Sequence, residues 1–188
     1  MGGENRKSGW WTRLRRPSAK WSVGLLLGTG FVIGILFWGA FNTAMEMTNT
    51  EQFCVSCHAM REHMYAEYKE SPHYRNASGV RATCPDCHVP KAWHYKVLRK
   101  IEASNELWHM LLGSIDSKEN FVAKRQELAE RVWATMRETD SRECRNCHDF
   151  NAMAFDEQDK RARLRHQKAD EKGKTCIDCH QGVVHELP

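Results

Sequence analysis

The pentapeptide Cys84-Pro85-Asp86-Cys87-His88 carries the pattern that decides the fold of this chain. The same Cys-x-x-Cys-His spacing occurs three more times, so the four copies use all eight cysteines of the 188 residues. The other copies are Cys54-Val55-Ser56-Cys57-His58, Cys144-Arg145-Asn146-Cys147-His148 and Cys176-Ile177-Asp178-Cys179-His180. This spacing is typical of c-type haem attachment, in which both thiols bond to the haem vinyl groups and the histidine reaches the iron.

Other uses of paired cysteines fit this pattern less well. Zinc takes four nitrogen or sulfur ligands from one compact set. Neither a disulfide framework nor a thioredoxin-like redox pair explains why a histidine follows every second cysteine. We therefore predict four covalently bound haem c groups. The attachment residues are Cys54, Cys57, Cys84, Cys87, Cys144, Cys147, Cys176 and Cys179, and the proximal iron ligands are His58, His88, His148 and His180.

The segment that follows residue 45 is short for the cofactors it has to hold. Residues 46–188 contain all four motifs, which leaves about 36 residues for each haem. A chain of that size cannot enclose four macrocycles and also build a separate apolar core. We predict that the haems themselves form the core, and that the apoprotein does not fold because the ligands and the core disappear together.

An uncharged apolar stretch covers residues 21–45. As an α-helix its 25 residues would reach roughly 37 Å, and the hydrocarbon core of a bilayer is about 30 Å thick. The alternative is a cleaved signal peptide, which has a shorter apolar region and a small-residue cleavage site. We expect a retained, single-pass transmembrane helix that anchors the protein in the bacterial inner membrane.

The charge of the chain is unevenly distributed. Residues 1–20 contain six basic residues and one acid, whereas the remainder contains 22 basic and 23 acidic residues. Basic residues before a span favour a cytoplasmic N-terminus, so residues 46–188 are expected in the periplasm. We do not expect nucleic-acid binding, because the basic tail directly precedes the membrane span.

The motifs are arranged as two haem pairs, 54–88 and 144–180. In each pair the second motif follows a threonine and has aspartate before its second cysteine, and this similarity suggests an old duplication. Apolar residues at helical spacing predict helices over 91–112 and from 116 to about 140 between the pairs. The predicted fold is mainly α: one transmembrane helix and a haem-packed, mostly helical domain built from two two-haem units.

Six histidines outside the motifs are candidates for the second axial position of each iron. His73 and His166 hold matching positions before the second and fourth motifs, and His185 follows His180 by five residues. We predict these three as distal ligands, which leaves one iron short. The first motif continues into Met60, so either His58 or Met60 is expected to ligate that iron, and the alternative for Met60 is an ordinary packing residue. The remaining histidines, His63, His94 and His109, are expected to be non-ligands.

The span, the four motifs, the Cys-x-x-Cys-His-x-Met sequence and the segment 78–90, SGVRATCPDCHVP, together resemble the NapC/NirT family. The resemblance implies a membrane-anchored tetrahaem quinol dehydrogenase that feeds a periplasmic nitrate or nitrite reductase, or its cytochrome subunit. It implies His73, His166 and His185 as distal ligands and Met60 as an axial ligand of the first haem. It also implies a site for menaquinol or ubiquinol near the first haem, with Lys100 and Glu106.

The residues suggest how such a site would work. Quinol oxidation releases two electrons and two protons, so a proton acceptor has to stand near the first haem. A carboxylate in an apolar site acquires a raised pKa, and Glu106 is expected to act as the base while Lys100 hydrogen-bonds a quinone oxygen. Cys54 follows Met45 by nine residues, so an extended tether reaches at most roughly 30 Å. The alternative for Lys96, Arg99 and Lys100 is a solvated helix face. Two alternative functions are a passive electron carrier and a terminal reductase.

Overall fold

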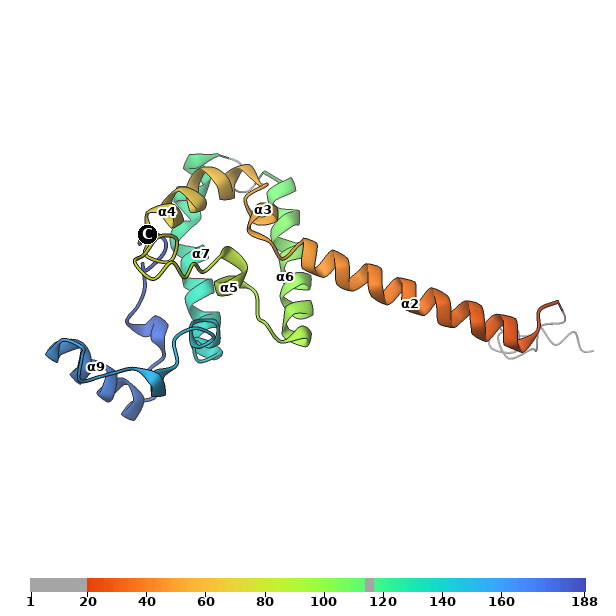
Figure 1. Cartoon of the computed structure of the whole chain (residues 1–188). Helices are drawn as coiled ribbons and strands as arrows, with labels where there is room; N and C mark the ends of the chain where they lie inside the picture. Colours follow the sequence, from red (N-terminus) through yellow and green to blue (C-terminus); the bar gives the residue numbers. More distant parts are fainter. Residues whose placement is uncertain (1–19, 114–116) are drawn as a thin grey trace, which may run out of the picture. The chain divides into compact units, whose positions relative to one another are not determined.

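A computed structural model describes residues 20–113 and 117–188 (Figure 1). The described residues form helices and no strand, which confirms the predicted mainly α fold. The chain divides into two compact units, of which the first ends at Glu46 and the second is Met47–Pro188. The basic tail predicted over residues 1–20 lies outside the described residues, apart from Lys20.

The apolar stretch forms one continuous helix, α2 (Val23–Met47), displaced by two residues from the predicted 21–45. Its length and composition are sufficient to cross a membrane. Large apolar side chains such as Leu27, Phe31 and Phe37 are exposed along it. In water this surface would be unfavourable, whereas in hydrocarbon it needs no covering partner.

The second unit is a set of short helices around two longer ones, α6 (Trp93–Leu111) and α7 (Lys118–Glu138). These two correspond to the helices predicted over 91–112 and 116–140. The side chain of Ser117 caps α7 by accepting from the backbone N–H of Asn120, whereas Asp116 lies outside the described residues. The other elements are α3 (Glu51–Cys54), the π-helix η1 (Met60–Met64), α4 (Tyr65–Glu70), α5 (Cys84–His88), α8 (Arg142–Arg145), η2 (Phe150–Ala152), α9 (Lys160–Glu171) and η3 (Cys176–Asp178).

The second and fourth motifs begin with the same capping box. The backbone N–H of Thr83 donates to Asp86 Oδ2 at 2.8 Å, and that of Thr175 donates to Asp178 Oδ2 at 2.9 Å. In both cases the carboxylate also accepts from the threonine hydroxyl, so each motif starts its helical turn in a defined orientation. The matched threonines and aspartates of the sequence therefore perform the same local function.

The four motifs are neighbours in the order in which they occur in the chain. Helix α3 of the first motif packs on α5 of the second, and α5 packs on α8 of the third. Ser141, fully buried with a φ of +48°, begins α8 and accepts at 3.2 Å from the backbone N–H of Ile177 in the fourth motif. The fold thus places the attachment sites in a continuous series.

The second unit buries very few apolar side chains of its own. Only Ala59, Tyr68, Phe121 and Ile177 are buried hydrophobic residues among its described residues. Helix α6, in contrast, exposes a series of large apolar side chains: Trp93, Tyr95, Leu98, Ile101, Leu107, Trp108 and Leu111. The polypeptide alone supplies little core, and large flat cofactors are the kind of partner that such surfaces fit.

Candidate functional site

None of the eight cysteines forms a disulfide, so all of them are available for haem attachment. The thiols of the first two motifs are in contact: a hydrogen bond from Cys84 lowers the pKa of Cys54 to about 7, and the same contact raises the pKa of Cys84. Burial, followed by the negative charge of Cys144, raises the pKa of Cys87 to about 11. Burial and the charge of Cys176 raise the pKa of Cys144. The sulfurs of successive motifs therefore lie within electrostatic reach of one another, and those of Cys54 and Cys84 are in hydrogen-bond contact.

Three histidine pairs join a motif histidine to a histidine from elsewhere in the chain. The ring centroids lie 6.2 Å apart for His73 and His148, 6.3 Å for His88 and His185, and 6.0 Å for His166 and His180. Two metal–nitrogen bonds of about 2 Å on opposite sides of one ion, with the half-width of each ring added, give a separation of about 6 Å. The spacing fits an iron held between each pair, so the residues present fit haem.

The protonation state of these histidines also suits ligation. Burial, assisted by the charges of His185 and Arg99, lowers the pKa of His88 to about 4, and burial likewise lowers the pKa of His185. A neutral imidazole is the form that binds a metal. The Nδ1 atoms of His73 and His185 are buried and have no hydrogen-bond partner. Gln158 Oε1 lies 2.7 Å from Nδ1 of His166, which leaves Nε2 of that ring for a metal.

His185 is held by a clamp built from distant parts of the chain. Arg125 of α7 makes two bonds to the Glu67 carboxylate of α4, at 2.7 and 2.8 Å, and a third to the carbonyl oxygen of Glu186 at 2.6 Å. The backbone N–H of Glu186 donates to Glu67 at 3.0 Å, and His185 Nδ1 lies 3.7 Å from the same carboxylate. Bidentate arginine–carboxylate pairs are geometrically specific, so this pair positions the C-terminal residues against His88.

The clamp can be tested with one substitution. Arg125→Met should free the C-terminal residues, so that part of the population loses the sixth ligand at one haem and shows a high-spin signal in the visible and EPR spectra. Added imidazole should restore the low-spin signal. Arg131→Met is the matched control, because Arg131 lies on the same helix and forms only an exposed pair with Glu127. Equal spectra for both variants would contradict the positioning role of Arg125.

The first motif differs from the other three. His58 is exposed, and among the described residues no ring contact joins it to another histidine. His63 stacks on Phe121 with centroids 4.9 Å apart, and His94 lies 4.1 Å from Tyr95, so both have aromatic packing partners. The exposed Met60 follows His58 by two residues. The sequence predicted that the first iron lacks a second histidine. In the described residues His58 accordingly has no histidine facing it.

The structure brings Lys100 to the first motif. Its Nζ donates to the carbonyl oxygen of Thr48 at 2.5 Å and lies 5.9 Å from the centre of the Phe53 ring. After the hydrogen bond from Cys84, the charge of Lys100 is a further cause of the lowered pKa of Cys54. Lys100 is therefore within electrostatic reach of the first attachment site.

Glu106, in contrast, is not brought to the same place. Six residues along an α-helix leave two side chains about 120° apart around the axis, and the Glu106 side chain is 64% exposed and forms an ion pair with Arg99 at 2.8 Å. Its predicted role as a base beside the first haem stays a prediction.

A carboxylate that the sequence analysis missed lies much closer to the first motif. Glu51 opens α3, three residues before Cys54, and its side chain is 10% exposed. Oε1 pairs with Arg81 at 2.5 Å, whereas Oε2 is buried without a hydrogen-bond partner. Arg81 also donates from Nε to the Tyr68 hydroxyl at 3.0 Å. The sequence position of Glu51 could have indicated this. Residues three apart share one face of a helix, so Glu51 lies on the same face as Cys54.

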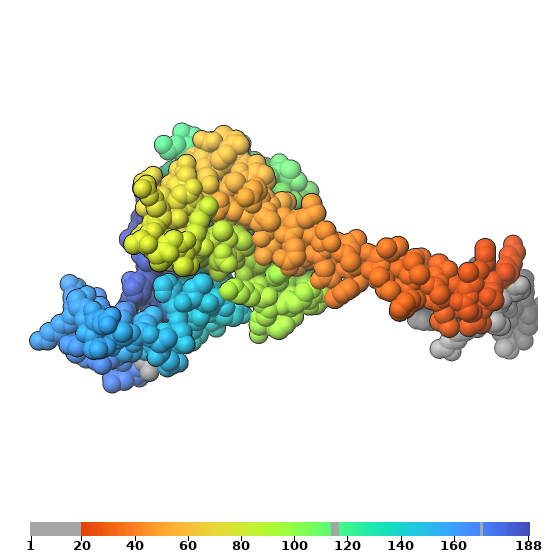
Figure 2. Space-filling view, in the orientation of Figure 1, coloured from red at the N-terminus to blue at the C-terminus, as the bar shows by residue number. Residues whose placement is uncertain are grey.

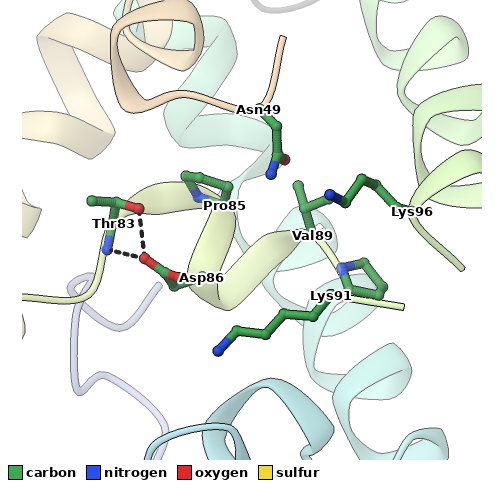
Figure 3. A pocket seen from close by; sticks show the side chains of 8 residues that line it. Asn49, Thr83, Pro85, Asp86, Val89, Lys91 and Lys96 are labelled. Carbon is green, nitrogen blue, oxygen red and sulfur yellow. Dashed lines mark hydrogen bonds between the residues drawn. The ribbon is translucent and has the colours of Figure 1, made fainter. Parts of the chain in front are cut away.

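A cavity of about 230 Å³ lies beside the second motif (Figure 3). Thr83 and Asp86, joined by the bonds of the capping box, form one wall, whereas Lys91 comes from the segment before α6 and Lys96 from α6 itself. Asn49 closes the cavity, and its Oδ1 atom is buried without a hydrogen-bond partner. The remaining wall is apolar, formed by Pro85, Val89 and Pro90. The cavity thus joins an unsatisfied acceptor to an apolar surface.

Comparison with known proteins identifies the family of the chain. Residues 16–188 match the family model described as NapC/NirT cytochrome c family, N-terminal region. The chain is 56% identical over its whole length to the denitrification system component NirT of Stutzerimonas stutzeri, of which it covers 93%. It is 50% identical to the cytochrome c-type protein NapC of Paracoccus pantotrophus, over 97% of this chain and 78% of that one. It also matches 46% of the cytochrome c-type protein TorC of Escherichia coli at 48% identity. No solved structure matches the chain.

Proposed function

Because this chain belongs to the NapC/NirT cytochrome c family, we propose that it oxidises a membrane quinol and passes the electrons through four haem c groups to a periplasmic reductase. The observation that carries this proposal is the contrast between the motifs. Three motif histidines each face a second histidine, whereas the first motif has none and lies beside Lys100. Three irons would then act as saturated electron carriers, and the first would stand next to polar groups suited to quinol chemistry.

The proposed ligand set follows from the pairs. His88 and His185 would hold the second haem, His148 and His73 the third, and His180 and His166 the fourth. The first haem would be held by Cys54 and Cys57, with His58 or Met60 on its iron. Haem bound at these sites would supply one-electron acceptance and transfer, and the order of neighbouring motifs supports a relay from the first to the fourth.

The residues near the first motif would bind the quinol and take up its protons. Lys100 would donate a hydrogen bond to a quinol oxygen and stabilise the negative charge that develops as the proton leaves. The unpartnered Oδ1 of Asn49 in the adjacent cavity would accept from a quinol hydroxyl. Glu106, as the resemblance implies, and the buried Glu51 are the two candidate proton acceptors, of which Glu51 has the free oxygen and the shorter chain distance to Cys54.

The proposed location is the inner membrane, with α2 as the only span among the described residues, the N-terminus in the cytoplasm and the haem domain in the periplasm. Cys54 follows the end of α2 by seven residues, so the first haem cannot be far from the membrane surface. The names of the relatives, NirT and NapC, favour a reductase of nitrate or nitrite respiration as the acceptor.

The test is stopped-flow mixing of the purified, oxidised protein with a menaquinol or ubiquinol analogue in detergent. We expect all four haems to be reduced without any other protein, followed by reoxidation when a periplasmic nitrate or nitrite reductase is added. If the pure protein stays oxidised with both quinols but is reduced by another membrane dehydrogenase, it is a passive electron carrier. If it turns over nitrite by itself, it is a terminal reductase.

Lys100→Gln is expected to slow reduction by the quinol analogue at least tenfold, because a donor aimed at developing negative charge is lost. The four-haem absorption spectrum should be unchanged. Lys118→Gln, at the exposed start of α7, provides the control for loss of one positive charge. Glu106→Gln and Glu51→Gln, measured in the same way, identify the proton acceptor. Only the substitution that removes the acceptor should make the reduction rate depend more steeply on pH. A normal rate for Lys100→Gln would remove this residue from the mechanism.

A further inference from the structure

Positive charge is concentrated around α9. Seven basic residues and only two acidic ones lie between residues 160 and 174. The basic residues, here named the α9 basic patch, are Lys160, Arg161, Arg163, Arg165, Lys168, Lys172 and Lys174. The second unit, Met47–Pro188, has 22 basic and 22 acidic residues in all, so without this segment 15 basic residues stand against 20 acidic ones. The patch is thus a positive region on an otherwise acidic unit.

The cations of the patch differ from the other arginines of the unit in their partners. Outside α9, eight arginines form ion pairs with a carboxylate: Arg61, Arg81, Arg99, Arg125, Arg131, Arg137, Arg142 and Arg145. Within the described part of the chain, no ion pair involves any of the seven patch cations. Eight of the nine arginines elsewhere in the described part of the unit are paired, Arg75 being the exception, so the three unpaired arginines of α9 point to a partner outside the chain.

Part of the patch lies beside the last attachment site of the series. Arg161, Arg165 and Lys168 follow one another at spacings of four and three residues and so share one face of α9. A hollow of about 190 Å³ is lined by Arg165, Lys168, Ala169, Lys172, Lys174 and the exposed Cys179. Figure 2 shows the blue segment that contains α9 at the surface, uncovered on the side in view. Four of the seven cations, Arg165, Lys168, Lys172 and Lys174, therefore lie beside the sulfur at which the edge of the fourth haem would be attached.

Two other roles for the patch fit less well. On a haem ring the vinyl edge and the propionate edge are opposite one another, so cations gathered at a vinyl-linked cysteine are poorly placed to neutralise the propionates of that haem. A helix that lies on a membrane needs a broad apolar face as well as a basic one. In α9 the only large aliphatic residue is Leu164.

We propose that the α9 basic patch is the docking surface for a soluble redox protein with an acidic surface around its own cofactor, which takes electrons from the fourth haem. This proposal rests on the proposed function, since it names the exit of the same relay. Complementary charges around the two cofactors would steer the encounter and orient the partners edge to edge. At each encounter one electron leaves the reduced protein and reduces one oxidised centre of the acceptor.

The experiment uses the complete holoprotein, reduced with dithionite so that quinol oxidation plays no part. Two acceptors of opposite charge are mixed with it by stopped flow: plastocyanin, an acidic copper protein, and mitochondrial cytochrome c, a basic one. The unsubstituted protein should reduce plastocyanin at least tenfold faster than the triple variant Arg165→Gln/Lys168→Gln/Lys172→Gln does. The rate with the unsubstituted protein should fall steeply as the salt concentration rises. In the variant, copper(II) should be reduced slowly with little salt dependence, whereas mitochondrial cytochrome c should react as fast as before or faster.

Lys69→Gln/Lys118→Gln/Lys124→Gln is the matched control, with the same change in net charge on other elements. Equal losses in both triple variants would mean that net charge alone matters and would overturn the docking surface. A shifted haem potential or altered spectrum in the α9 variant would assign the cations to the cofactor instead. The α9 variant could instead lose binding to vesicles of anionic phospholipid while it reduces both acceptors at unchanged rates. That result would identify the patch as a membrane-binding surface and would overturn the proposal. Titration of the oxidised holoprotein into plastocyanin, followed by NMR, measures binding without electron transfer. Equal chemical-shift changes of plastocyanin with the unsubstituted protein and with the α9 variant would also overturn the proposal.

Discussion

Residues 47–188 are expected to lose nearly all of their helical structure when haem is not attached. Only four apolar side chains are buried in the described part of this unit, and one of them is the small Ala59. Ordering the backbone costs about 1–2 kcal/mol for every residue. The stabilisation that offsets this cost has to come from contact between haem and the exposed apolar faces of helices such as α6 and from the iron–histidine bonds. The measurement is far-ultraviolet circular dichroism of the full chain, made with and without cytochrome maturation.

Removing one haem at a time gives this prediction a graded form. The second motif contacts both the first and the third, whereas the fourth is the last of the series. Cys84→Ala/Cys87→Ala should therefore lower the unfolding temperature more than Cys176→Ala/Cys179→Ala does. A haem-free chain with native helicity and a cooperative thermal transition would show that the polypeptide has a core of its own, contrary to the burial pattern.

Much of this architecture is predictable because the signals are local. An attachment motif needs five consecutive residues, a membrane span needs one apolar stretch, and α6 and α7 follow from helical periodicity within single segments. The capping boxes at Thr83 and Thr175 are likewise visible as a threonine followed three residues later by aspartate. In each case the interacting residues are close in sequence, so the pattern contains the whole interaction.

The parts that the sequence did not reveal depend on the path of the chain in space. Glu67 and Arg125 are separated by 58 residues, and no spacing rule connects them to His185. The charge around α9 was hidden because acids elsewhere in the unit cancel it in the total. Glu106 and Lys100 both lie on α6, but they point in different directions around the helix axis and Glu106 pairs with Arg99. A motif that gives only the order of residues along the chain does not contain this information.

The pairing of His73 illustrates the same limit and gives the last prediction. The sequence offers His73 and His166 as equivalents, yet His166 faces the histidine of the motif that follows it, His180, whereas His73 faces His148 in the other haem pair. We expect His73→Ala to convert one low-spin haem to high spin, and the affected haem to be the third. Since the potential of a haem depends on its axial ligands, its reduction potential should also rise.

Double variants identify the iron that His73 binds. His148→Met alone should remove one bis-histidine signal in near-infrared magnetic circular dichroism, and so should His73→Ala alone. Combined, they should still remove only one signal if both residues bind the same iron. His73→Ala combined with His88→Met should remove two, because His88 faces His185 instead. The reverse result, with two signals lost in the first combination and one in the second, would assign His73 to the second haem, because ligands on one iron cannot be lost independently.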